Sequence, residues 1–471
     1  MPNAHCPNVL FLFTDDQRFD TLAALGNPQI QTPNLDRLAA RGTCFTRAHI
    51  MGGTCGAVCM PSRAMLHSGR GLFRIAGRGR DIPPEHTTMG ECFRAAGYDT
   101  FGIGKWHNGG PSFTRSFAGG AEIYFGGMCD HWNVPAYHYD PAGRYAARLP
   151  RCVNPHTTNE VRWLPADHIH AGVHSSDLFA DAARSYLAGR SPGEAPFFLY
   201  VSFMAPHDPR VMPQEFRDLY DPETIELPPN GMGAHPFDNG ELKVRDELLE
   251  DWPRTPEAVR RHVAEYYAMI THADAAIGRI LQALEESGEA ENTLVVFAGD
   301  NGLAVGQHGL MGKQNLYEHS VRVPLLLAGP GVPAGQQRGP YAYLHDVFPT
   351  LCDLCGLSVP ASVEATSLRP ALADPAAALH PTLLLAYRNV QRAVKDDRWK
   401  LLEYAVAGRR RTQLFDLASD PWEQDDRSGD PACAARVEAL RGALARWRQA
   451  ADDPGGVGED VSFWDTYDAR T

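Results

Sequence analysis

The stretch Pro7-Asn-Val-Leu-Phe-Leu-Phe-Thr-Asp-Asp16 decides the fold of this chain. Its apolar residues from Val9 to Phe13 predict a buried strand, and two aspartates follow directly where that strand ends. Thr32-Pro33 then predicts the start of a helix that ends at Gly42. A buried strand followed by an amphipathic helix is the beginning of a βαβ unit, so the sequence predicts an α/β protein.

Further short apolar runs, bounded by turn residues, repeat this pattern along the chain. They predict strands at 100–103, 197–203, 293–298 and 323–328. The longest helix is predicted from Thr255-Pro256 to Gly288, because its apolar residues recur at helical spacing. We therefore expect residues 1–380 to form one catalytic α/β domain with a large, mostly parallel central sheet flanked by helices.

The pattern changes near residue 380, which predicts a second domain at 381–471. Four short runs between 383 and 417 are separated by polar turns and indicate a smaller antiparallel sheet. Residues 434–448 have helical periodicity and are expected to cover that sheet. An acidic, aromatic tail follows from Glu459, and we expect Trp464 and Tyr467 to be exposed or to pack on another subunit of a homo-oligomer.

Composition excludes several classes of partner. The chain has 471 residues with 44% hydrophobic and 21% charged residues, as in an ordinary globular protein. A formal net charge of −13 argues against binding nucleic acid or an anionic membrane. The ten cysteines lack a dense paired framework, and the amino end has no basic region followed by a long apolar segment. We therefore expect a cytoplasmic protein without a signal peptide.

Polar residues suited to catalysis follow four of the predicted strands. They are Asp15-Asp16, Lys105-Trp106-His107, Pro206-His207 and Asp300-Asn301. Ligands of open α/β sheets bind beyond the carboxyl ends of the strands, so these groups are expected to converge. Carboxylate and amide oxygens without thiol or imidazole partners predict a hard cation, Ca²⁺ with Mg²⁺ as the alternative. Taken singly, each Asp-rich pair is as consistent with a surface turn.

Seven sequence blocks carry a resemblance to the type I, formylglycine-dependent sulfatases of the alkaline phosphatase superfamily. The central block is Cys59-Met-Pro-Ser-Arg63, which resembles the signature at which the family converts a cysteine to formylglycine. The resemblance covers most of the chain in the family's order. The other blocks are Thr14-Asp-Asp-Gln17, Thr32-Pro-Asn-Leu-Asp-Arg-Leu38, Gly102-Ile-Gly-Lys-Trp-His107, Ala205-Pro-His207, Gly299-Asp-Asn-Gly302 and Gly306-Gln-His-Gly-Leu-Met-Gly-Lys313.

The resemblance implies a sulfuric ester hydrolase whose nucleophile is a modified Cys59. One hydroxyl of the hydrated aldehyde would attack sulfur, and the other would later allow sulfate to be expelled. A formylglycine-generating maturation enzyme is then an implied partner, and the implied substrate is a sulfated small molecule or saccharide. By similarity, the metal would be bound by Asp15, Asp16, Asp300 and Asn301, with residue 59 completing the shell.

The resemblance also assigns roles to the remaining site residues. Arg63 and Lys105 would hold and polarise the formylglycine, and Lys313 would bind a sulfate oxygen. His207 would stabilise or protonate the leaving oxygen, and His107 would deprotonate the second hydroxyl. His308 is a weaker, substrate-side candidate. His67 departs from the family, because it stands where an apolar residue is usual.

Two rival functions stay open at this point. One is a phosphonate monoester or phosphodiester hydrolase, because related folds use the same metal and nucleophile on phosphorus. The other is a non-catalytic binder of sulfate esters whose Cys59 is never modified. The irregular stretch between Cys129 and His174 is expected to select the substrate. Its histidines lack the spacing of a zinc motif and are interpreted as polar loop groups.

Overall fold

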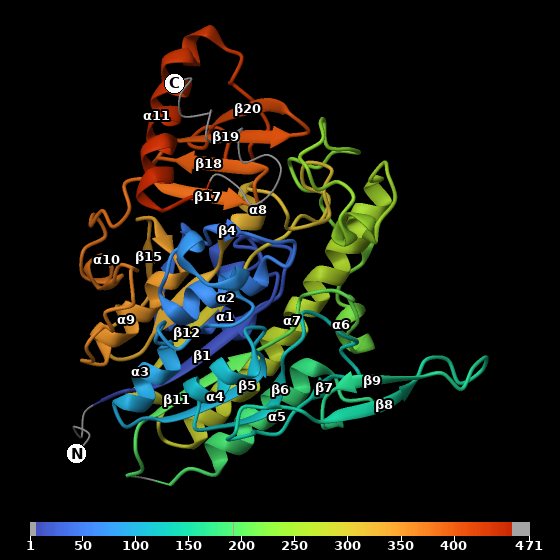
Figure 1. Ribbon diagram of the computed structural model, residues 1–471, viewed down its shortest axis with the longest axis vertical. Helices are drawn as coiled ribbons and strands as arrows, with labels where there is room; N and C mark the ends of the chain where they lie inside the picture. Colours follow the sequence, from blue (N-terminus) through green and yellow to red (C-terminus); the bar gives the residue numbers. More distant parts are fainter. Residues whose placement is uncertain (1–5, 192, 455–471) are drawn as a thin grey trace.

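The computed structural model describes residues 6–191 and 193–454 and has a large mixed sheet at its centre (Figure 1). The strand order is β15-β2-β14-β12-β1-β11-β5-β6. The bounds are β1 (Asn8–Thr14), β2 (Gly42–Phe45), β5 (Asp99–Lys105), β6 (Gly119–Tyr124), β11 (Phe197–Ser202), β12 (Thr293–Gly299), β14 (Leu325–Ala328) and β15 (Gln336–Arg338). This architecture confirms the predicted α/β fold class with its large central sheet.

The strands of this sheet run in one direction except β14, which is antiparallel to both of its neighbours, β12 and β2. Strand β1 pairs in parallel with both β11 and β12, and β5 joins β11 in the same direction. The run predicted at 323–328 divides at Pro324 into β13 (Arg322–Val323) and β14, and β14 pairs antiparallel with β12. Proline cannot donate a ladder hydrogen bond, which accounts for this interruption.

Helices cover both faces of the sheet, because alternate residues of β1 point to opposite sides. Leu10 and Leu12 pack in a core with helices α1, α5 and α7, whereas Val9, Phe11 and Phe13 pack in a core with α2, α3, α4 and α9. The helices of these two layers are α1 (Pro33–Arg41), α2 (Cys59–Ser68), α3 (Met89–Ala95), α4 (Gly110–Ser116), α5 (Ser175–Ala188), α7 (Pro256–Glu286) and α9 (Val347–Leu354). Strands buried on both faces read as continuous apolar runs, as β1 does.

A second sheet lies beside the first and has the order β20-β19-β18-β17-β4 (Figure 1). Its bounds are β4 (Gly52–Gly53), β17 (Leu383–Tyr387), β18 (Gln391–Lys395), β19 (Trp399–Val406) and β20 (Arg409–Asp416), and α11 (Ala434–Ala450) packs on it. The smaller antiparallel sheet with its covering helix is therefore present. Strand β4 joins it in parallel from just before α2, so the sheet is continuous with the amino-terminal part of the chain. The domain division at 380 stays a prediction, and Trp464 and Tyr467 lie outside the described residues.

The stretch from Cys129 to His174, expected to be irregular, contains four strands. They are β7 (Pro135–Ala136), β8 (Arg148–Cys152), β9 (Val161–Pro165) and β10 (His168–Ile169). The β8–β9 hairpin projects from the molecule (Figure 1) and is largely exposed, which explains why it lacks an alternating apolar pattern. The remaining strands and α-helices are β3 (Ala48–His49), β16 (Ala342–Tyr343), α6 (Gln214–Arg217), α8 (Glu318–Val321) and α10 (Arg369–Ala373). Among the helices described, none has the length and apolarity needed to cross a membrane.

Candidate active site

The carboxyl ends of four neighbouring parallel strands bring the predicted polar residues together. The strands stand in the order β12-β1-β11-β5. The first three are followed by Asp300-Asn301, Asp15-Asp16 and His207, and β5 ends at Lys105, with His107 two residues later. Asp15, Asp300, Asn301 and Lys105 have no exposed surface. A close approach between strands shapes this edge, since a Cβ on Gly104 would lie 2.1 Å from the carbonyl oxygen of Ser202. The predicted convergence is therefore present in the fold.

Helix α2 adds residue 59 and a buried guanidinium to this edge of the sheet. Cys59 is the first residue of α2, and its sulfur lies 3.4 Å from Nδ1 of His107 and 3.8 Å from Nζ of Lys105. One turn later Arg63 donates from Nε to Asp300 at 2.8 Å and from Nη2 to Asp15 at 3.2 Å. The family-like pentapeptide thus delivers both a candidate nucleophile and a cation that bridges two carboxylates.

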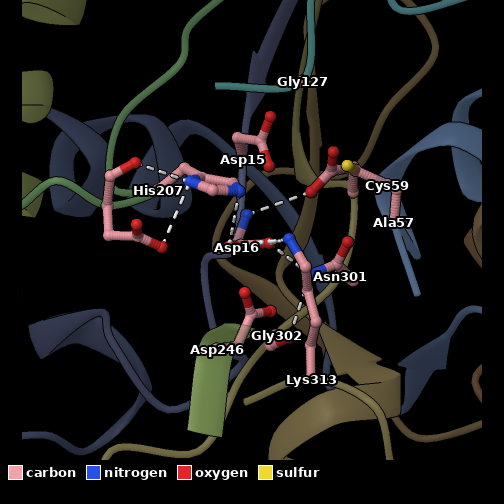
Figure 2. A network of polar contacts seen from close by, with 12 residues as sticks. Asp15, Asp16, Ala57, Cys59, Gly127, His207, Asp246, Asn301, Gly302 and Lys313 are labelled. Carbon is pink, nitrogen blue, oxygen red and sulfur yellow. Dashed lines mark hydrogen bonds and ion pairs between the residues drawn. The ribbon is translucent and has the colours of Figure 1, made fainter. Parts of the chain in front are cut away.

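Three cations balance three carboxylates in the cluster. Lys105 forms a short ion pair with Asp15, and Lys313 donates to both oxygens of Asp16 at 2.6 and 2.9 Å. Figure 2 shows Lys313 beside Asp16, with Asn301 close by. Lys313, predicted to bind a sulfate oxygen, therefore contacts a predicted metal ligand in this structure.

Two oxygens of the predicted ligand set have no hydrogen-bond partner among the described residues. They are Oδ1 of Asp15 and Oδ1 of Asn301, and both are buried. A buried polar atom without a partner is costly, so both oxygens are available to bind an ion or a water molecule. The ligand atoms of Asp15, Cys59 and Asp300 lie within 4.8 Å of one another, as do those of Asp15, Asp16 and His207. Oxygen donors in this arrangement fit a hard divalent cation such as Ca²⁺ or Mg²⁺.

Each of the two candidate histidines has a ring nitrogen directed at the cluster. His207 uses Nδ1 to donate to the backbone oxygen of Asp208 at 2.7 Å, which leaves Nε2 3.5 Å from Oδ2 of Asp16. His107 contacts the sulfur of Cys59 and has a positive φ of 72°. Asp16 also has a positive φ, of 64°. Backbone conformations of this kind in residues other than glycine are costly and concentrate at functional sites.

Burial and charge shift the proton affinities of these groups in different directions. Burial raises the pKa of the Cys59 thiol to about 12, so the unmodified thiol is neutral at physiological pH. Burial and the neighbouring charge of Asp15 raise the pKa of Asp300 to about 6. Burial also opposes ionisation of Asp15, but Lys105 and Arg63 outweigh it and lower the pKa of Asp15. Burial and the charge of Lys105 lower the pKa of His107 well below its ordinary value.

The ring of His308, the substrate-side candidate, makes its contacts with Tyr317 and Asn230. It stacks on Tyr317 with ring centroids 3.9 Å apart, and its Nε2 lies 3.1 Å from the amide nitrogen of Asn230. Its substrate role stays a prediction. His67, which departs from the family, is buried between aromatic rings, with centroid distances of 4.3 Å to Trp106 and 5.0 Å to Tyr200. The imidazole of His67 thus packs against two aromatic rings, at a position where the family usually has an apolar side chain.

Two residues that support the site were not predicted from the sequence. Ser202 accepts a hydrogen bond from Nη1 of Arg63 at 2.7 Å, and the carbonyl oxygen of Gly127 accepts one from Lys105. Ser202 is the last residue of β11, so its place at the carboxyl edge could have signalled it. Gly127 acts through its backbone, and the sequence holds no signal for that contact.

The chain is similar to family models, to characterised proteins and to solved structures. A family model described as Sulfatase matches residues 7–357, and one described as N-sulphoglucosamine sulphohydrolase, C-terminal, matches 306–450. The arylsulfatase of Clostridium perfringens is 28% identical, with 94% of this chain and 95% of that protein covered. The N-acetylglucosamine-6-O-sulfatase of Bacteroides thetaiotaomicron is 24% identical, with coverages of 92% and 85%. A phosphonate monoester hydrolase from Agrobacterium radiobacter shares the fold, with a TM-score of 0.73, 22% identity and coverages of 94% and 96%.

Proposed function

The chain belongs to the sulfatase family and is a sulfuric ester hydrolase, and we propose that it cleaves aryl or carbohydrate sulfate monoesters through residue 59 as formylglycine. The proposal depends on one observation: Cys59 lies among the polar residues at the carboxyl ends of four parallel strands and contacts His107 and Lys105. The names of two relatives, an arylsulfatase and an N-acetylglucosamine-6-O-sulfatase, support the two substrate classes.

The proposed metal is Ca²⁺, with Mg²⁺ as the alternative, bound by Asp15, Asp16, Asp300 and Asn301. The partnerless oxygens of Asp15 and Asn301 support this ligand set. Once bound, a divalent cation supplies positive charge that stabilises an anionic group and lowers the pKa of a bound hydroxyl. Ca²⁺ is preferred because its flexible coordination tolerates carboxylate and amide oxygens from separate loops.

The charges of the site favour an anionic substrate despite the negative charge of the whole chain. Arg63, Lys105 and Lys313 match the three carboxylates one for one, so the described cluster is close to neutral. A bound dication would make it positive by two charges. A buried cluster with this excess attracts a sulfate ester locally, because the interaction is strong where water is excluded.

Conversion of Cys59 by a formylglycine-generating enzyme fits the surroundings of the thiol. A neutral, buried thiol with a pKa of about 12 is a poor nucleophile. The hydrate of an aldehyde at this position supplies two hydroxyls, which suits a reaction with a covalent sulfate intermediate. Lys105 lies close enough to orient residue 59, with its Nζ 3.8 Å from the sulfur.

We propose that the two histidines take part in separate proton transfers. His107 lies beside residue 59, and the burial that lowers its pKa keeps the ring neutral and able to accept a proton. His207 presents Nε2 from the side of Asp16, so we propose that it donates a proton to the leaving oxygen. Each ring then acts on a different oxygen of the reaction.

The decisive experiment combines mass spectrometry with one pair of cysteine variants. We expect the peptide containing residue 59 from the native host to carry formylglycine, and Cys59→Ala to abolish hydrolysis of an aryl sulfate while the circular dichroism spectrum is retained. Cys55→Ala is the matched control, because Cys55 lies four residues away and donates only to the backbone oxygen of Ala57. An unmodified thiol in active protein, or full activity in Cys59→Ala, would refute the mechanism.

The competing phosphorus chemistry is tested on the same preparation. We expect a higher kcat/KM for an aryl sulfate than for an aryl phosphonate monoester or phosphodiester. The reverse preference would assign the chain to the rival activity. A screen of sulfated mono- and disaccharides against the aryl sulfate then separates the two proposed substrate classes. Cytoplasmic location and assembly into a homo-oligomer stay predictions.

A further inference from the structure

A second group of side chains that could hold a metal ion lies in the part of the chain from β6 to the start of α5. It is formed by Glu122, His168 and His170, with Asp167 in contact with His168, and it shares no residue with the cluster around Cys59. Glu122 belongs to β6, and His168 begins β10. The strands are linked through β7, since Ile123 bridges to Tyr137 and Ala136 pairs with His168. The two segments are therefore held in a fixed relation by backbone pairing.

Three ligand atoms converge in this group. Nε2 of His168 lies 2.8 Å from Oε2 of Glu122, and Nε2 of His170 lies 3.2 Å from Oε1 of the same carboxylate. All three ligand atoms lie within 4.8 Å of one another. The side chains of Glu122 and His168 are 13% and 16% exposed, whereas His170 is 46% exposed. The group is thus mostly enclosed but open to solvent on the side of His170, which provides an entry path for an ion.

Asp167 fixes the orientation of the central imidazole. Its Oδ1 makes a short contact with Nδ1 of His168, so that nitrogen donates and Nε2 is the one directed at Glu122. Asp167 is itself held by the backbone N–H of His138, at 3.2 and 3.0 Å from its two oxygens. The ring of His138 stacks on His168 with centroids 4.2 Å apart. A carboxylate that orients a histidine in this way is a recurrent support of zinc ligands.

We propose that Glu122, His168 and His170 form a binding site for a transition-metal ion of intermediate softness, with Zn²⁺ as the expected ion. This site is separate from the site of the proposed catalytic cation. Two imidazoles and one carboxylate suit Zn²⁺, and three protein ligands leave a fourth position for water. The oxygen donors around Cys59 suit a hard cation instead, so the two sites differ in the ion they prefer.

The spacing of the histidines could not have indicated this site. His168 and His170 are separated by one residue, which matches no common zinc motif, and Glu122 precedes them by more than forty positions. Only the pairing of β6, β7 and β10 brings the carboxylate to the imidazoles. Three residues after β6 ends, the carbonyl oxygen of Gly127 accepts a hydrogen bond from Lys105. An ion bound at Glu122 would therefore stabilise a strand that leads to the active site.

The test uses the full-length protein in excess CaCl₂, which keeps the oxygen-rich site filled. Zn²⁺ binding is measured by competition with a chromophoric chelator, and Zn²⁺-dependent stabilisation by thermal unfolding. We expect one Zn²⁺ per chain that excess Ca²⁺ does not displace. His170→Ala and Glu122→Gln should each weaken binding at least about tenfold, and Asp167→Asn by about 10- to 100-fold. Each of these variants should retain the circular dichroism spectrum of the unmodified chain, so that weaker Zn²⁺ binding can be assigned to the altered side chain and not to unfolding.

His156→Ala is the matched control, because His156 is an exposed histidine of the same region outside the group. It should bind Zn²⁺ like the unmodified chain. Absence of Ca²⁺-resistant binding, or equal affinity in His170→Ala and His156→Ala, would overturn the proposal and leave a hydrogen-bonded network of side chains. These outcomes do not depend on hydrolysis, so they are distinguishable from a failure of the proposed activity.

Discussion

Replacing Arg63 by methionine should destabilise the protein because it leaves two buried carboxylates short of a partner. Arg63 has no exposed side-chain surface and pairs with Asp15 and Asp300 at 3.2 and 2.8 Å. Methionine keeps an unbranched apolar stem and much of the volume of the side chain but removes the charge and all hydrogen-bond donors. The change therefore isolates the electrostatic contribution from the packing contribution.

The magnitude follows from the cost of breaking a buried ion pair. Removing one partner costs about 3–5 kcal/mol, because an uncompensated charge stays in the interior. Two pairs are lost together, but the costs are not additive, since Lys105 still neutralises Asp15. We therefore expect the free energy of unfolding to fall by about 3–5 kcal/mol in Ca²⁺-free buffer. Added Ca²⁺ should recover part of this loss, because a bound dication takes over the charge of the carboxylates.

The assay is denaturant unfolding followed by tryptophan fluorescence, with and without Ca²⁺. Arg41→Met is the matched control, because Arg41 makes an ion pair with Glu285 in which both side chains are more than half exposed. Exposed pairs contribute about 0–1 kcal/mol, so the control should change stability little. If Arg63→Met loses no more stability than Arg41→Met, the bridging role of Arg63 is refuted.

Three further perturbations test individual side chains. Asn301→Ala should abolish the rise in melting temperature caused by Ca²⁺, because the partnerless Oδ1 is removed; an undiminished rise would contradict the ligand assignment. His207→Ala should lower kcat/KM about 10²–10⁴-fold for a sugar sulfate and less for a nitrophenyl sulfate, whose leaving group needs no proton, whereas equal losses would argue against proton donation. Burial lowers the pKa of His67 from 6.5 to about 3, so the neutral ring contributes stability that is complete above pH 6.5 and declines as the pH falls toward 3. His67→Leu should therefore reduce the loss of unfolding free energy between pH 7 and pH 5 by about 2 kcal/mol, measured by denaturation at both values.

Much of the fold could be predicted because its strongest signals are local. The continuous apolar run of β1 follows from burial on both faces, and the helix predicted at 255–288 matches α7 closely. The order of four parallel strands could not be read from the chain, yet the rule that ligands bind beyond their carboxyl ends was enough to predict that Asp15, Lys105, His207 and Asp300 converge.

Local pattern was less informative where contacts are made by backbone atoms or by distant segments. The run at 323–328 was predicted as one strand, but Pro324 divides it and β14 pairs antiparallel with β12. The stretch from Cys129 to His174 was expected to be irregular, yet it contains four short strands. Strands β8 and β9 are largely exposed and therefore lack an alternating apolar pattern, whereas β7 and β10 are only two residues long and too short to show one.

The sequence by itself determined the chemical character of this protein: an α/β chain with a family-like cysteine motif and oxygen donors after its strands. Only the tertiary structure decided which charges face one another, such as Arg63 between Asp15 and Asp300, Lys313 on Asp16, and Glu122 beside His168. The physical reason is the range of the forces involved. Burial and helical periodicity act over a few neighbouring residues and leave a local pattern, whereas ion pairs join side chains that the sequence places far apart.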